Sequence, residues 1–194
     1  MSDFSVIGAV STTLQNLLNT NITLSTGVLG GIPIDLHSPK EMQDGGLTGV
    51  SVWLYKVSRM AEMLNDPPER RNANQLQRAP LPVQLYYLMT PVMQEPVTRH
   101  IVLGRVLQVF NDNAIIRGSD LQGVLQGSGE QLRVNLEALT IQELSLVWEA
   151  LSEPYQLSVT YLVQVVKIDS DMEPVRSSPV LERDAAYTQI VAQT

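Results

Sequence analysis

The chain has 194 residues, 44% of them hydrophobic, which is enough to bury roughly 70% of the surface of the unfolded chain around one core. Its 20 acidic residues outnumber 13 basic ones, and the net charge of -7 argues against nucleic acid and anionic lipid as partners. The absence of cysteine excludes disulfides, thiolate metal sites and cysteine nucleophiles. No signal-peptide pattern and no run of about 18 apolar residues is present, so we expect synthesis in the cytoplasm and no membrane span.

The N-terminal segment is predicted to form an amphipathic helix over residues 3–19, capped by Ser2 or Asp3. Its apolar side chains recur at intervals of three and four residues, which places them on one helical face: Ile7, Val10, Leu14, Leu17 and Leu18. From residue 21 to residue 49, short apolar runs alternate with glycine and proline. This pattern predicts short strands joined by turns.

Two segments rich in β-branched and aromatic residues follow, at residues 49–57 and 81–90. Both are predicted to be strands covered on both faces. The segment between them, residues 65–78, is polar and contains Pro67 and Pro68, with almost nothing to bury. A mobile surface loop is therefore expected there.

Pro96 suits the first turn of a second helix, predicted to run to about Phe110 and to end at Asn111–Asn113. Its expected buried stripe consists of Val97, Ile101, Val102, Val106, Val109 and Phe110. Residues 132–139 then alternate apolar and polar side chains, which predicts a strand with one face in water.

A capping box formed by Thr140 and Glu143 predicts a third helix, ending near Leu151 before Pro154. Its expected buried residues are Leu144, Val147, Trp148 and Leu151. Residues 155–169 alternate over about 50 Å of extended chain, longer than a usual strand, so we expect a bulge or a reach to a neighbouring subunit. Residues 171–194 contain two prolines and few large apolar side chains, and are expected to form an extended C-terminal arm.

These elements together predict an α/β (α+β) fold. Residues 1–170 would form a single domain, in which a mixed or antiparallel sheet is flanked by about three helices.

No catalytic, cofactor or metal residue is predicted. The two histidines, His37 and His100, are far apart in sequence, and nothing in their spacing favours a triad or a metal site. The alternating acids Asp169, Asp171 and Glu173 could share a face and hold a cation, but the glycine and closing glutamate of a calcium loop are absent. The glycine clusters lack the residues that complete a phosphate-binding loop.

Basic and aromatic residues outside the predicted core are the candidates for contact with a partner. Arg70, Arg71 and Arg78 form the basic cluster of the polar loop, which could be merely solvated or could order against an acidic surface. Further candidates are Arg99, His100, Arg176, Arg183 and Tyr187.

Two segments resemble one known family. The first is His100–Phe110, continuing at Ile115–Gly118, and the second is Leu139–Leu151, continuing at Pro154–Tyr161. They are similar to the cap, or tail-terminator, proteins of extracellular contractile injection systems, the phage-tail-like particles of the antifeeding-prophage and Photorhabdus virulence cassette type. The resemblance spans residues 3–170.

The resemblance implies a fold like that of phage tail terminators and a six-fold ring of copies. This ring would end the inner tube, contact the inner tube protein and the sheath protein, and have no enzymatic activity. The finished particle could be released or anchored to a membrane. Two alternatives stay open: a free-standing adaptor that binds peptides at a sheet edge, and a small hydrolase without a recognisable motif.

Overall fold

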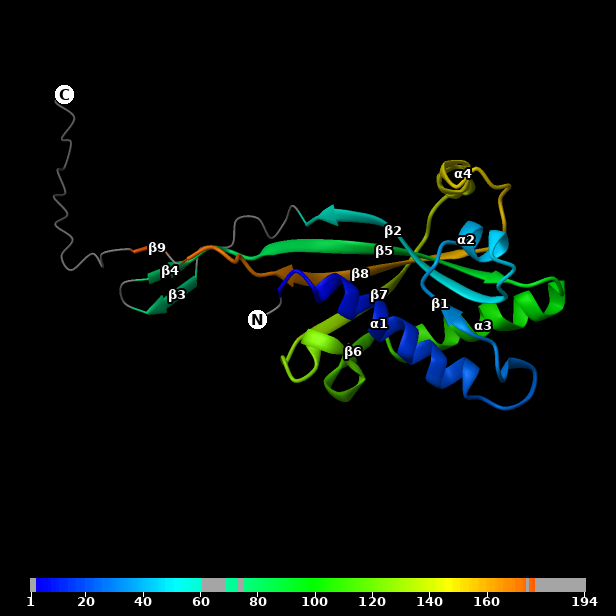
Figure 1. Cartoon of the computed structure of the whole chain (residues 1–194), viewed down its shortest axis with the longest axis horizontal. Helices are drawn as coiled ribbons and strands as arrows, with labels where there is room; N and C mark the ends of the chain where they lie inside the picture. Colours follow the sequence, from blue (N-terminus) through cyan, green and yellow to red (C-terminus); the bar gives the residue numbers. More distant parts are fainter. Residues whose placement is uncertain (1–2, 61–68, 73–74, 174, 177–194) are drawn as a thin grey trace, which may run out of the picture.

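A computed structural model describes residues 3–60, 69–72, 75–173 and 175–176 (Figure 1). These residues form an elongated molecule, with the helices gathered around one end of a long sheet and a smaller sheet projecting from the other end (Figure 1). The predicted fold class, an α/β domain with a mixed sheet and flanking helices, is confirmed.

The main sheet has six strands in the order β1-β2-β5-β8-β7-β6. β1 pairs with β2 in parallel, and every other neighbouring pair is antiparallel. The long central strands confirm the two predicted strands around residues 49–57 and 81–90. The bounds are β1 Ile34–Asp35, β2 Gly49–Arg59, β5 Leu81–Val92, β6 Ile115–Arg117, β7 Gln131–Glu137 and β8 Val159–Ile168.

The smaller sheet consists of β3 (Glu69–Asn72), β4 (Gln75–Gln77) and β9 (Val175–Arg176), all antiparallel, and we call it the arm sheet. It continues the β5 and β8 strands beyond the helices (Figure 1). The expectation that residues 65–78 form a loop is therefore wrong for seven of them, because backbone pairing overrides their polar composition. Residues 65–68, 73–74, 174 and 177–194 lie outside the described residues.

In the described part of the chain, four α-helices accompany the sheets: α1 (Val6–Leu18), α2 (Pro39–Asp44), α3 (Pro96–Asp112) and α4 (Ile141–Ala150). The three predicted helices are confirmed, although α1 begins after Ser5 and Asp3 instead receives a hydrogen bond from the Ser5 N–H. The α1 helix continues as a π-helical turn over Asn19–Thr23, and α2 stands where only strands and turns were expected.

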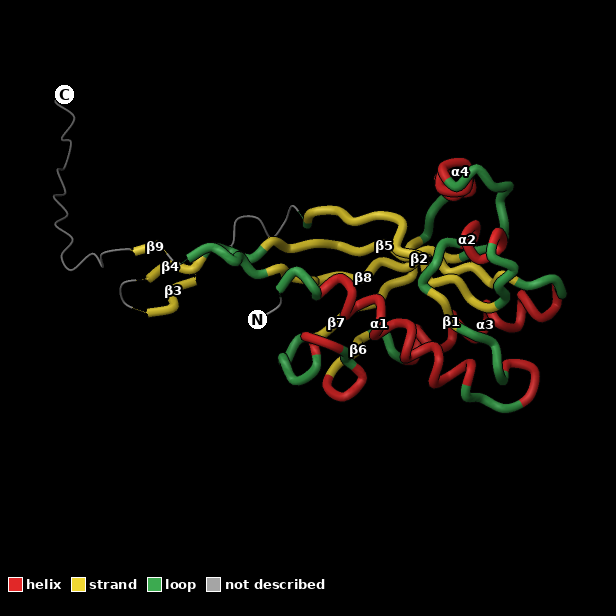
Figure 2. The backbone as a smooth tube through the Cα atoms, viewed as in Figure 1, coloured by secondary structure: helices red, strands yellow, loops and turns green. Residues whose placement is uncertain are grey.

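One face of the main sheet packs against α1 and α3 (Figure 2). Alternate residues of β5 point to this face, and helix residues spaced by four meet them, so one continuous core forms. The aromatic rings of Phe110 on α3 and Tyr161 on β8 lie 4.8 Å apart between their centroids. The most completely buried members are Val10, Leu14, Leu18, Ile22, Leu85, Tyr87, Met89, Val102, Val106 and Val163.

The opposite face is covered by α4 at one end. Trp148 and Leu151 pack on Leu88 of β5, and Trp53 and Tyr55 of β2 border this second cluster. The Trp148 indole N–H donates to the Ser158 hydroxyl at 3.3 Å. Further along the same face, the Lys56 ammonium lies 4.5 Å from the centre of the Tyr86 ring, a cation–π contact.

Three details of the sequence-based prediction were wrong. Val97 and Ile101 are 62% and 44% exposed, while Leu103, which was not expected in the α3 stripe, is buried. The buried residues of α3 begin at Val102, so the first turn of the helix lies outside the packed part. β8 begins at Val159, since residues 155–158 instead connect it to α4. The expected bulge is present in β8, where Val163 to Val166 lies opposite Leu85 to Val83.

Gly49 begins β2 with φ +148°, a conformation that L side chains rarely adopt. A Cβ atom built on Gly49 would lie 2.3 Å from the carbonyl oxygen of Pro33. The next residue, Val50, donates its N–H to that same oxygen at 2.9 Å. This close approach allows the β1 segment to lie parallel against β2.

Replacing Thr90 with valine is expected to leave the free energy of unfolding unchanged or to raise it by up to about 1 kcal/mol. Thr90 is fully buried on β5, and its hydroxyl has no hydrogen-bond partner among the described residues. Thr160→Val is the matched control, because the Thr160 hydroxyl donates to the Glu137 carbonyl at 2.8 Å. Urea denaturation should show a loss of about 1 kcal/mol for the control only; equal losses in both variants would contradict this prediction.

Candidate assembly interface

The two ends of the molecule carry different surfaces, and the arm sheet forms one of them (Figure 1). Three predicted contact residues come together there through their backbones. Arg70 on β3 pairs with Leu76 on β4, Gln75 on β4 pairs with Arg176 on β9, and Arg71 lies at the irregularity between Arg70 and Asn72. Residues about a hundred positions apart in sequence thus share one small sheet.

The remaining predicted contact residues are scattered. Arg78 is exposed just after β4. Arg99 is half-buried, and its guanidinium donates to the Met93 carbonyl at 2.5 Å, so it holds the turn between β5 and α3. His100 is exposed on the first turns of α3. Arg183 and Tyr187 lie outside the described residues.

A second surface lies at the opposite end, and we call it the α3 end: Val97, His100 and Ile101 on α3, with the loop around Val28 (Figure 1). An open pocket of about 410 Å³ joins the Val28 loop to Glu95 and Thr98. Exposed apolar side chains beside a pocket are typical of protein contact sites. The sequence did not predict this surface, because Val97 and Ile101 recur at the spacing of a buried helical face.

The outer side of α4 forms a third surface that sequence reasoning missed. Ile141 is 75% exposed and Leu146 is 59% exposed, and Tyr155 and Leu157 are exposed in the segment that follows the helix. The signal was present in the sequence, since α4 carries apolar residues around most of its circumference. A helix with apolar residues around most of its circumference can bury one side against its own sheet and present the other side to a partner.

One histidine–carboxylate pair is present at the end of β1. The Nδ1 atom of His37 lies 2.5 Å from Oδ1 of Asp35, and the Ser51 hydroxyl donates to the main-chain carbonyl of His37 at 2.6 Å. The hydroxyl therefore bonds to the backbone and not to the imidazole, which differs from the geometry of a nucleophilic triad. Among the described residues, no group of three or more His, Asp or Glu side chains is placed to hold a metal ion.

The imidazole of His37 is expected to titrate above the ordinary value of 6.5. The hydrogen bond to Asp35, and then the charge of that carboxylate and of Glu41, raise the pKa of His37. The stability that the contact between His37 and Asp35 contributes is therefore fully present below pH 6.5. It is lost as the pH rises through the raised pKa of His37. An NMR titration of the ring protons measures this midpoint.

The Asp35→Asn variant should return the His37 midpoint toward 6.5. Asp44→Asn is the control, since Asp44 contacts Lys40 and not His37. If Asp35→Asn leaves the midpoint where it was, Asp35 does not hold the proton on His37.

An open pocket of about 520 Å³ lies beside the main core, between α3 and β7. Phe110, Leu136 and Tyr161 contribute to its wall, and it contains no acid or basic side chain. Its chemistry suits the insertion of an apolar side chain better than a reaction on a substrate.

The sequence comparison decides the family. Residues 9–182 match the family described as the Pvc16 N-terminal domain. The chain belongs to this family. No curated protein matches it. Among the described residues, no helix is both long and apolar enough to cross a bilayer.

Two solved structures share the fold of this Pvc16 N-terminal domain protein. One is a sheath/tube terminator of an extracellular contractile injection system, the PVC, in its extended state: 18% identity, TM-score 0.62, all of this chain and 67% of that chain covered. The other is the tube-terminating cap of the anti-feeding prophage: 18% identity, TM-score 0.64, with 92% of this chain and 60% of that chain covered. Both relatives are longer, and their identity to this chain is low enough that the likeness establishes the fold alone.

Proposed function

We propose that this protein is the terminating cap of a contractile injection particle. Copies of the chain form a six-fold ring that ends the inner tube and contacts the last layer of the sheath. The observation that carries this proposal is the likeness, over nearly the whole chain, to two proteins that are themselves tube terminators. Family membership over residues 9–182 supports it.

The distribution of surfaces is compatible with a ring. A closed ring of identical subunits is built from head-to-tail contacts, so each subunit needs two different patches. The arm sheet and the α3 end are different in composition and lie at opposite ends of the molecule (Figure 1). The outer side of α4, with exposed Ile141 and Leu146, is then left for the tube or the sheath.

We assign the protein a binding role and not a catalytic one. It would be made in the cytoplasm and become part of the particle, with protein partners and no nucleic acid, as its net charge of -7 favours. Replacing His100, Asp169 and Asp171 tests the assignment. A cap keeps its ring and its place on the particle through these changes, whereas an enzyme loses turnover.

Deletion of the gene tests the proposed function directly. Electron microscopy of particles from the deletion strain should show tubes and sheaths of irregular length, because nothing stops their growth. Complementation with the wild-type gene should restore uniform length. Particles of normal length in the deletion strain would show that this chain does not terminate the tube.

The mass of the purified protein separates the cap from an adaptor. Native mass spectrometry, alone and with isolated tubes, should find a six-fold assembly in at least one of the two conditions. An adaptor that binds peptides at a sheet edge would stay monomeric in both.

A further inference from the structure

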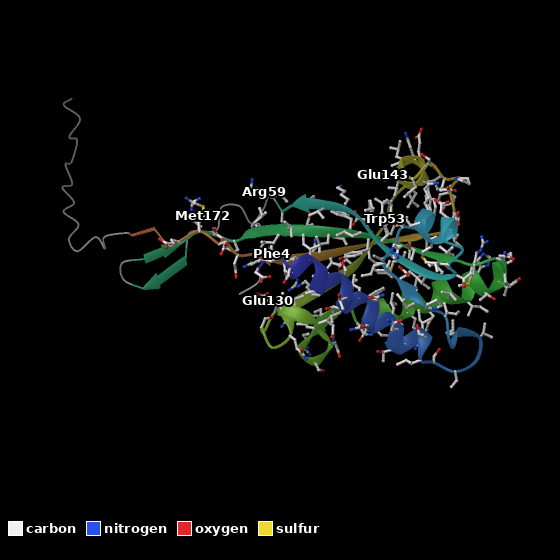
Figure 3. The ribbon with its side chains drawn as sticks, in the orientation of Figure 1. Phe4, Trp53, Arg59, Glu130, Glu143 and Met172 are labelled. Atoms are coloured by element: carbon white, nitrogen blue, oxygen red, sulfur yellow. The ribbon has the colours of Figure 1, made fainter. Side chains whose placement is uncertain are left out.

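The outer edge of β2 is open over most of its length. β1 pairs with β2 only at Val50 and Ser51, and among the described residues no strand pairs with Trp53–Arg59 on the side opposite β5. Arg59 lies at the end of this stretch, toward the arm (Figure 3). Within the described part of the chain, the backbone N–H and C=O groups on this side of Trp53–Arg59 therefore have no strand partner.

This edge contains no proline. Lys56, Arg59 and a register irregularity between Leu54 and Lys56 restrict which strand can pair with it. The apolar side chain of Val57, within this stretch of β2, is 48% exposed. The edge strands β1 and β6 are only two and three residues long, and β7 continues beyond β6 without a strand partner only over Asn135–Glu137 among the described residues.

The chain itself contains a segment suited to fill the edge, at residues 187–192. Its sequence, Tyr-Thr-Gln-Ile-Val-Ala, is rich in β-branched and aromatic residues and has no charge and no proline. It is nearly as long as the open part of β2. Main-chain pairing supplies the affinity in such additions, and alternate side chains supply the specificity.

The direction of the chain favours a donor from another copy. β9, the last described element, lies in the arm sheet at the far end of the molecule from the helices, beyond the end of β2 (Figure 1). Residues 177–186 separate Arg176 from Tyr187, and ten residues span up to about 35 Å. A span of this length is sufficient to reach a subunit that lies beside the arm.

We infer that residues 187–192 of one copy add as a strand to the open edge of β2, at Trp53–Arg59, in the neighbouring copy. This inference rests on the proposed ring, since it requires a neighbour at the arm. The exchange would link each subunit to the next and would complete the main sheet with a seventh strand.

Cysteine cross-linking tests the inference, and the chain has no cysteine of its own to interfere. Val57 pairs with Leu85, a member of the α1/α3 core, so its side chain points to that face, and Ser58 points to the other. Two differently tagged proteins are mixed, one carrying Val57→Cys and the other Ile190→Cys or Gln189→Cys, and are then oxidised. Ser58→Cys replaces Val57→Cys in the matched control.

The expected result is a cross-link between the two tags that depends on face. Each cysteine in the donor segment should link to position 57 or to position 58 but not equally to both, since neighbouring strand residues point to opposite faces. A six-fold assembly without any such cross-link overturns the inference and leaves the proposed function standing. A cross-link only within one chain, seen in a double variant, overturns the exchange between copies. A protein that is monomeric with and without tubes contradicts the proposed function itself.

A variant in the donor segment gives a second readout. Ile190→Pro removes a backbone donor from the added strand and should raise the concentration at which the ring dissociates by about tenfold or more. Ser178→Pro, in the preceding linker, should leave that concentration unchanged. Because both positions lie outside the described fold, circular dichroism should show no change in either monomer; equal dissociation of both variants would contradict the inference.

Discussion

Replacing Gly49 with alanine is expected to lower the free energy of unfolding by about 3 kcal/mol or more. The added methyl group would meet the carbonyl oxygen of Pro33 at 2.3 Å, and the residue would have to hold a φ of +148°. The contact is with backbone, so no side-chain rotation relieves it. The β1 segment would separate from β2, and the Val50 N–H would lose its hydrogen bond to Pro33.

Gly104→Ala is the matched control for that substitution. Gly104 lies within α3, and a Cβ atom there would have no neighbour within 4 Å. Alanine should therefore stabilise the protein by about 0.5–1 kcal/mol through its better helix propensity. Guanidinium denaturation of the two variants measures both effects; a loss below about 1 kcal/mol for Gly49→Ala would show that the β1–β2 junction shifts easily.

Replacing Trp148 with alanine is expected to cost about 3–5 kcal/mol, the range for a large buried aromatic residue. Trp148 is the central residue of the cluster that attaches α4 to the sheet, and it packs on Leu88 beside Leu151. The α1/α3 core on the other face does not depend on it. The loss should therefore be concentrated in α4, which we expect to open before the rest of the domain.

Hydrogen exchange followed by mass spectrometry checks where that loss falls. In Trp148→Ala, amides of residues 141–150 should exchange much faster, while amides of α1 and α3 should stay protected. Leu146→Ala, on the exposed side of the same helix, should change the free energy of unfolding by no more than about 0.5 kcal/mol. Uniform loss of protection across the domain would show that the two faces of the sheet fold as one unit.

The sequence predicted those elements whose signal is local. α1, the later turns of α3 and α4 each repeat apolar residues at helical spacing, and the Thr140–Glu143 capping box is present as expected, with the Glu143 N–H donating to the Thr140 hydroxyl at 3.3 Å. α2 carries the same local signal. Ser38 and Glu41 form a second capping box with Pro39 in the first turn, but the surrounding glycines concealed it.

The elements that the sequence did not predict depend on contacts between distant residues. β3, β4 and β9 are too short and polar to be recognised singly, and they are strands only because they pair with one another. The same pairing brings Arg70, Arg71 and Arg176 together. The exposure of Val97 and Ile101 follows from where α3 crosses the edge of the sheet, which no periodicity reports. Family resemblance, in contrast, followed from two continuous segments and is confirmed.

Helices cover the two faces of the main sheet to different extents, so residues on the two faces of β5 tolerate substitution differently. Leu85, Tyr87 and Met89 are enclosed by two helices, so an altered side chain there disturbs the whole domain. Gln84 and Tyr86 point to the face that α4 leaves bare, where Tyr86 meets Lys56. Natural variation can therefore remodel the face that carries Gln84 and Tyr86 while the packed face keeps the domain folded.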